Sequence, residues 1–90
     1  MQNIISNLNK AFESRIRLGI MSVLMVNDGV DFNTMKELLE LTDGNLASHA
    51  KALAGLNYIQ SSKQFIGRKP NTQYSITDEG RTAFQDHLNA

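Results

Sequence analysis

Four side chains of one predicted helix, over residues 43–56, have the chemistry to recognise nucleic-acid bases. Asn45, Ser48 and His49 offer hydrogen-bond donors and acceptors, and Lys51 adds a positive charge. At 100° per residue these positions lie on or beside the arc opposite an apolar stripe. The helix has no carboxylate after its first residue, so this face can approach a polyanion. Asparagine is suited to hydrogen-bonding adenine, and serine pairs with several bases.

The same residue types do not suggest catalysis or metal binding. Ser48 and His49 are adjacent on a helix, where neighbouring side chains diverge, so they do not form a nucleophile–base pair. His49 and His87 are the only histidines, are far apart in sequence, and have no cysteine to complete a metal site. The acids between residues 28 and 43 spread around a helix and its turns, as on a solvated face. We expect no enzymatic activity, no cofactor and no metal.

Chain length and composition favour a single small domain over residues 1–90. Ninety residues bury a limited core, which dimerisation often supplements. The absence of cysteine excludes disulfides and fits a reducing compartment. There is no apolar run long enough to span a bilayer, and the first residues lack the pattern of a signal peptide. We therefore expect a soluble, cytoplasmic protein with no membrane partner.

Charges are segregated along the chain although the formal net charge is zero. The segment 44–77 contains four basic residues and no acid, whereas the segment 28–43 contains five acids and one lysine. Such segregation allows one basic face on a neutral protein. Chance is the alternative explanation.

The basic segment includes a predicted β-hairpin. Residues 58–66 and 72–76 mix aromatic, β-branched and polar types as half-buried strands do. Residues 67–71 supply the turn, with Arg68 and Lys69 beside a proline that stiffens it. A basic pair at a stiff turn extends charge toward phosphates or a minor groove. An ordinary solubilising turn is the alternative.

Helices are predicted on both sides of this hairpin. An apolar helix over 13–26 ends at an Asn-Asp-Gly cluster, and residues 30–32 suggest a short strand. Asn33 is expected to cap a helix that ends near residue 41 and buries Leu38, Leu39 and Leu41. The next helix is expected to start at Thr42 or Asp43, to bury Leu46, Ala50 and Leu53, and to end near residue 56. Asn57 suits a left-handed cap, and Thr77 is expected to cap a last helix.

These elements form a helix-turn-helix followed by a hairpin, within a mainly α fold that has a small β-hairpin (α+β). The sequence resembles short stand-alone winged-helix regulators related to the MarR and ArsR families of prokaryotic transcription factors. The resemblance covers nearly the whole chain, through SRIRLGIMSVL, FNTMKELLELTDGNLASHAKAL, NYI and FIGRKPNTQYSITDEGR. It implies a homodimer whose terminal helices form the dimer contact and whose recognition helices enter successive major grooves.

The resemblance also assigns roles to individual positions. Base reading would fall to Asn45, Ser48 and His49, although His49 equally suits a packed flank. Backbone contacts would come from Thr42, Lys51, Lys63, Arg68, Lys69 and Asn71. The dimer contact would use Ile4, Ile5, Leu8, Phe12, Phe84 and Leu88.

We interpret the sequence as a homodimeric transcriptional regulator that binds double-stranded DNA sequence-specifically. The alternative is a winged helix used for protein–protein contact without DNA binding, because a fold does not dictate a function. Zero net charge and the small residues on the recognition face keep this alternative open.

Overall fold

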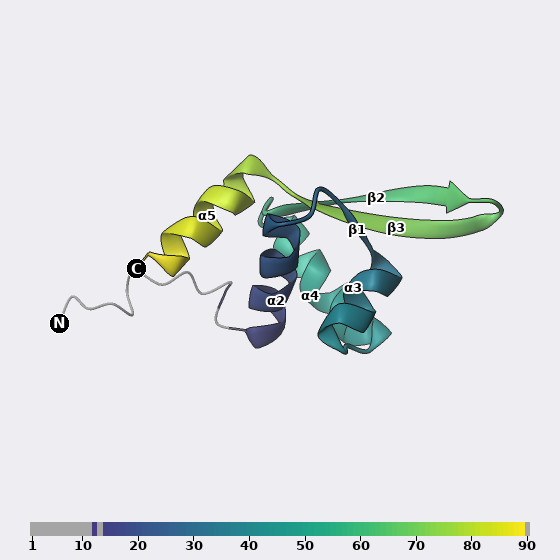
Figure 1. Cartoon of the computed structure of the whole chain (residues 1–90), viewed down its shortest axis with the longest axis horizontal. Coiled ribbons are helices and arrows are strands. Elements are labelled where there is room, and N and C mark those ends of the chain that lie inside the picture. Colours follow the sequence, from purple (N-terminus) through teal and green to yellow (C-terminus); the bar gives the residue numbers. More distant parts are fainter. Residues whose placement is uncertain (1–11, 13, 90) are drawn as a thin grey trace.

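The computed structural model describes residue 12 and residues 14–89. This part of the chain forms four helices and a three-stranded antiparallel sheet (Figure 1). In chain order the elements are α2 (Arg15–Met25), β1 (Val30–Asp31), α3 (Phe32–Leu39), α4 (Asp43–Gly55), β2 (Ile59–Ile66), β3 (Lys69–Ile76) and α5 (Asp78–Leu88). The predicted α+β winged helix-turn-helix is confirmed.

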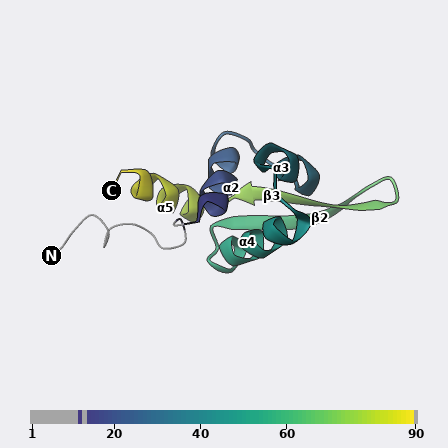
Figure 2. The same cartoon turned by 90° about the horizontal axis from the view of Figure 1, so that it is seen from below.

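The sheet has the order β1-β3-β2, with β3 in the centre. The two-residue β1 pairs with β3 only at Gln73 and Tyr74. The hairpin of β2 and β3 is much longer and projects beyond the helices at the end of the molecule opposite α5 (Figures 1 and 2). The outer part of the hairpin is therefore covered by no helix of the described chain.

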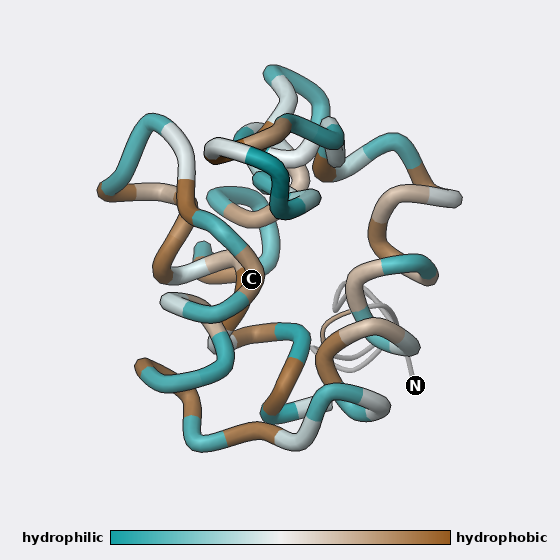
Figure 3. Tube along the Cα trace, turned by 90° about the vertical axis from the view of Figure 1, so that its right-hand side faces the viewer, coloured by the Kyte–Doolittle hydropathy of each residue, from teal (hydrophilic) through white to brown (hydrophobic). Residues whose placement is uncertain are grey.

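One apolar core joins the helices to the inner half of the sheet. Hydrophobic and hydrophilic residues are interspersed along each helix (Figure 3), as in helices that bury one side against a core. Within the described residues, the buried hydrophobic side chains are Phe12, Ile20, Met21, Leu24, Val30, Met35, Leu46, Ala50, Leu53, Ile59, Tyr74 and Phe84.

The first helix of the helix-turn-helix differs in two respects from its prediction. Asp31, not Asn33, is its N-cap, and the Asp31 carboxylate accepts the Thr34 N–H at 2.7 Å. Met35 is fully buried whereas Leu38 is 59% exposed. The helix is short because Glu40 takes a left-handed conformation, with φ of 53°, and ends it.

The hairpin loop is tighter than predicted. Ile66 pairs with Lys69, so the loop consists of Gly67 and Arg68 alone, and Gly67 has a φ of 66°. Pro70, predicted in the turn, instead lies within β3. A proline is tolerated there because β1 does not reach it and the edge of β3 facing away from β2 is unpaired at that point.

Helix α5 starts at a close backbone approach to the segment that follows α4. The Thr77 hydroxyl donates to the Asn57 carbonyl at 2.7 Å and accepts the Gly80 N–H at 2.8 Å. The Thr77 N–H donates to the Tyr58 carbonyl at 3.1 Å. Gly80 lies so near that carbonyl that a Cβ there would be well inside contact distance. Thr77 is the predicted cap, and Asn57 has the predicted left-handed backbone, with φ of 63°.

We expect two glycine-to-alanine substitutions to have opposite effects. Gly80→Ala should lower the free energy of unfolding by about 1–3 kcal/mol or more, because the methyl group displaces the Tyr58 backbone. Gly55→Ala should raise it by about 0.5–1 kcal/mol, because a Cβ there meets no neighbour and glycine disfavours a helix. Urea unfolding followed by circular dichroism measures both. A loss of stability in Gly55→Ala, or none in Gly80→Ala, would contradict the described packing.

Candidate nucleic-acid interface

Helix α4 presents a polar face because its opposite face is buried. Leu46 and Leu53 are fully buried and Ala50 is 2% exposed, in the predicted phase. Asn45, Ser48 and Lys51 are exposed on the other side of the helix. The remaining residues of that side are all glycine or alanine: Gly44, Ala47, Ala52 and Gly55. The backbone of this face can therefore approach a flat or grooved partner closely.

The N-terminal end of α4 is well defined. The Thr42 hydroxyl oxygen accepts the Asn45 N–H at 3.1 Å, which satisfies one of the free donors of the first turn. Lys36 of α3 forms an ion pair with Asp43 at 2.8 Å. Thr42 is exposed, so its hydroxyl hydrogen is accessible to a phosphate oxygen beside the helix N-terminus.

His49 is half-buried at the flank of α4 and contacts α2. Its Nδ1 atom accepts a hydrogen bond from Arg17 Nε at 3.0 Å. An accepting Nδ1 carries no proton, so the neutral ring has its hydrogen on Nε2. His49 thus has both features that the sequence left open: it packs on the flank, and it keeps one donor. Arg17 pairs with this ring and with no acid in the described contacts.

The outer hairpin is a strongly exposed basic projection. Every residue from 61 to 70 is exposed, including Lys63, Arg68 and Lys69. We call this outer hairpin, residues 61–72, the wing. No carboxylate occurs anywhere in residues 44–77, so the wing and the part of α4 after Asp43 belong to one acid-free stretch of sequence.

Asn71 differs from the other predicted backbone contacts. It is half-buried, its Nδ2 donates to the Asp31 carboxylate at 3.4 Å, and its Oδ1 is inaccessible. This contact joins the root of the wing to the start of α3. The structure therefore places Asn71 in a supporting position rather than on the surface with Arg68 and Lys69.

The predicted dimer residues are only partly described. Ile4, Ile5 and Leu8 lie outside the described residues. Phe12 and Phe84 are both buried within the chain, where their rings meet edge-to-face with centroids 5.5 Å apart. The Phe12 ring also packs beside the Tyr58 ring, with the two ring centroids 5.5 Å apart. This placement corrects the expectation that both phenylalanines face a partner subunit. Leu88 is 62% exposed.

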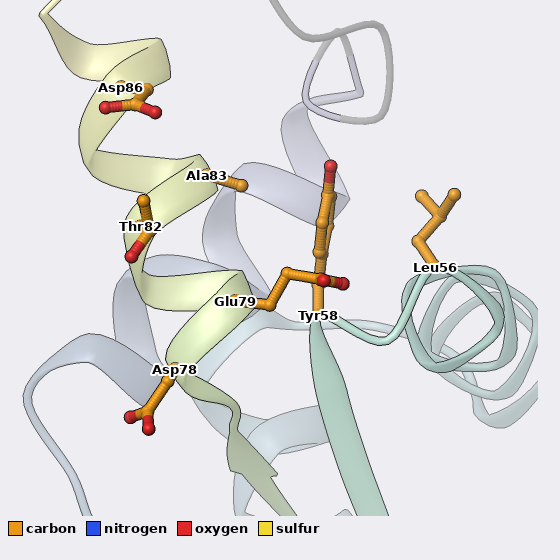
Figure 4. Close-up of a pocket in the computed structure, with 7 residues that line it drawn as sticks. All are labelled: Leu56, Tyr58, Asp78, Glu79, Thr82, Ala83 and Asp86. Atoms are coloured by element: carbon orange, nitrogen blue, oxygen red, sulfur yellow. The ribbon is translucent and has the colours of Figure 1, made fainter.

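An acidic groove lies at the end of the molecule away from the wing. Figure 4 shows its side chains: Asp78, Glu79 and Asp86 on α5, with Tyr58 between this helix and Leu56. The described structure thus separates a basic wing from an acidic α5. Such a charge distribution orients a neutral protein toward a polyanion.

No group of three or more histidine, aspartate or glutamate side chains among residues 12 and 14–89 is arranged to hold a metal ion. None of the described helices is long and apolar enough to cross a membrane.

Sequence reasoning missed two residues at the wing tip. Phe65 and Ile66 were expected in a half-buried strand, but they are 73% and 62% exposed. Counting the strand register outward from a two-residue loop at Gly67-Arg68 would have placed both at the tip of the hairpin.

Helix α3, helix α4 and the long hairpin together define a winged helix-turn-helix protein. The chain belongs to the winged helix DNA-binding domain family, whose model matches residues 16–90.

Relatives and solved structures agree with this assignment. A protein of uncharacterised function from Methanocaldococcus jannaschii is 37% identical over 79 residues, which cover 88% of this chain and 86% of that protein. A transcriptional regulator homologue from Pyrococcus horikoshii superimposes with a TM-score of 0.75 at 32% identity, covering 89% of this chain and 84% of that chain.

More distant structures share the fold alone. Bacillus subtilis PadR, solved in complex with operator DNA, has a TM-score of 0.76 at 14% identity and covers 86% of this chain and 49% of its own. Two MarR-family regulators share the fold at 15% identity or less. The resemblance to MarR-type winged-helix regulators is confirmed.

Asp31 supports the interface, and its contribution should depend on pH. Hydrogen bonds from Thr34 and a weaker one from Asn71 hold the pKa of the Asp31 carboxyl below its ordinary value despite some desolvation. A lowered folded-state pKa means that the stabilisation is fully present above the unfolded-state pKa of about 4. It is lost as the pH falls through the lower, folded-state value.

We expect Asp31→Ala to lower the free energy of unfolding by about 1 kcal/mol at neutral pH, because the N-cap is lost. Asp31→Asn keeps a capping oxygen and should cost less. The deficit of Asp31→Asn relative to the wild type should shrink as the pH is lowered from about 7 to about 3. Urea unfolding at several pH values measures it. A deficit that grew toward acid pH would show that the carboxylate is not stabilising.

Proposed function

We propose that this protein is a homodimeric transcriptional regulator that binds double-stranded DNA sequence-specifically. Helix α4 enters the major groove, and the wing contacts the backbone or the adjacent minor groove. The observation that supports this most strongly is the acid-free stretch 44–77, which includes both the polar face of α4 and the exposed wing. The family to which the chain belongs is described as DNA-binding, and PadR of the same fold has been solved on operator DNA.

The base-reading residues are Asn45, Ser48 and His49. Asn45 and Ser48 are exposed near the N-terminal half of α4, where a helix docked in the major groove contacts base edges. His49 contributes through Nε2, while Arg17 fixes its ring from behind. The small residues around them remove obstacles to close approach.

Affinity comes from phosphate contacts. Lys51 on α4 and Lys63, Arg68 and Lys69 on the wing are exposed cations without a carboxylate on their own elements after Asp43. Thr42 adds a hydroxyl at the helix N-terminus. Each phosphate contact releases condensed counterions, so binding should weaken as salt rises.

We also propose that the protein binds DNA as a dimer. Two recognition helices on successive grooves would match a two-fold symmetric site. Exposed Leu88 at the end of α5, together with Ile4, Ile5 and Leu8 of the N-terminal segment, is the proposed contact. The protein acts by binding, without catalysis, in the cytoplasm.

A salt titration of the double variant Arg68→Ala, Lys69→Ala tests the wing. A pool of randomised duplexes first supplies a bound sequence, and affinity is then measured on this duplex and on a scrambled one. The slope of log K against log salt should flatten by about 0.9 per lost contact, or about 3.6 for two residues on each of two wings. Both duplexes should lose affinity about equally.

Arg81→Ala is the matched control, because Arg81 is an exposed cation on α5 at the acidic end of the molecule. Its salt slope should equal that of the wild type. An unchanged slope in the double variant would remove the wing from the DNA interface. No binding by the wild type to any duplex in the pool would favour the protein-contact alternative.

A further inference from the structure

The wing tip exposes two large apolar side chains that the fold does not need. Phe65 is 73% exposed and Ile66 is 62% exposed, and they are the last two residues of β2 before the loop. The other exposed large hydrophobic residues of the described chain are isolated from one another in sequence. Single exposed apolar residues are ordinary, but two successive ones at the end of a projection, one on each face, make the tip a candidate contact site.

Strand pairing places the two residues on opposite faces of the hairpin. Phe65 pairs with Pro70, and Ile66 pairs with Lys69. Because directly paired residues share a face and alternate residues share a face, Phe65 and Pro70 lie on the face that has buried Ile59 and Tyr74 farther in. At that inner position the face is covered by the helices, so Phe65 and Pro70 point to the same side of the sheet as the helices do, and Ile66 points to the other side.

The charges around Phe65 and Ile66 indicate which kind of partner the wing tip contacts. Arg68 and Lys69 adjoin it at the turn, Lys63 lies two residues before Phe65 on the same face, and the strands have no acid. A protein surface of anionic character would satisfy the charges alone, whereas an anionic lipid surface and duplex DNA each offer negative charge together with apolar surface. Membership of a DNA-binding family favours duplex DNA, in which phosphates line the minor groove and the faces of stacked base pairs offer apolar surface when a step opens. Apolar side chains inserted between base steps are an established means of bending DNA.

We infer that the wing tip is an apolar wedge for the DNA minor groove. Phe65, flanked by Pro70, enters between two base pairs and partly unstacks them, while Arg68 and Lys69 hold the neighbouring phosphates. Pyrimidine–purine steps unstack most readily, so the wedge adds sequence preference at positions that no hydrogen bond reads. This inference rests on the proposed DNA binding and adds a deformation of the DNA to it.

The test places the fluorescent base 2-aminopurine at successive positions of the selected duplex, beside the wing, and measures its fluorescence, which rises when the base is unstacked. The bend angle of the duplex is measured separately, by energy transfer between dyes at its two ends. Wild-type protein should raise the fluorescence at one step and bend the duplex. Phe65→Ala should abolish the rise and reduce the bend. Its salt slope should stay that of the wild type, because no charge is removed. Phe65 is mostly exposed, so a thermal melt should be unchanged.

Leu56→Ala is the matched control, since Leu56 is an exposed apolar residue, 46% accessible, beside the acidic groove. It should leave fluorescence and bend unaltered. If wild-type protein binds the duplex with a steep salt slope but neither unstacks nor bends it, the wedge is wrong while DNA binding stands. The wedge is also wrong if Phe65→Ala changes only self-association in sedimentation. Failure of the wild type to bind duplex DNA would overturn both proposals.

Discussion

The packing of α4 against α2 is the contact on which the interface depends. Leu46 and Leu53 are fully buried, and burial of a leucine side chain contributes about 1.5–3 kcal/mol. Ala50 between them is also buried, at 2% exposed, and completes the stripe. Since a helix is rigid, burying this stripe determines that Asn45 and Ser48 face outward. The hydrogen bond from Arg17 to His49 adds a polar link along the same contact.

A second constraint connects this helix to the wing and to α5. Thr77 bonds the backbone after α4 through its own N–H and hydroxyl, and Gly80 allows the two backbones to meet. The inner ends of β2 and β3 start from this junction, where Ile59 pairs with Ile76. The direction of the wing relative to α4 is therefore set at the root, and the Asn71–Asp31 contact supports it farther out. The residues proposed to read bases and to contact phosphates are thus positioned by one continuous framework.

Patterns within a few residues of sequence correctly predicted the features that depend only on neighbouring residues. The phase of α4 and the left-handed Asn57 follow from periodicity and capping alone, and the same patterns narrow the cap to Thr42 or Asp43, of which the structure has Thr42. Errors arose where a distant neighbour decides. Asp31 is preferred to Asn33 as a cap because β1 brings it into the sheet directly before the helix. The exposure of Phe65 depends on how far the helices reach along the hairpin, and the burial of Phe12 and Phe84 depends on a contact between the two ends of the chain. Neither the reach of the helices along the hairpin nor the contact between these distant segments can be read from sequence patterns.

The most direct test of the central claim is a nuclear magnetic resonance titration of isotopically labelled protein with the selected duplex, recording backbone amide shifts along the chain. We predict the largest shifts in the first half of α4, from Asp43 to Lys51, and in the wing around Arg68 and Lys69. Amides of α5 from Asp78 to Asp86, beside the acidic groove, should move least. Shifts concentrated on α5 and Leu56, with α4 and the wing unperturbed, would contradict the assignment of this face to DNA.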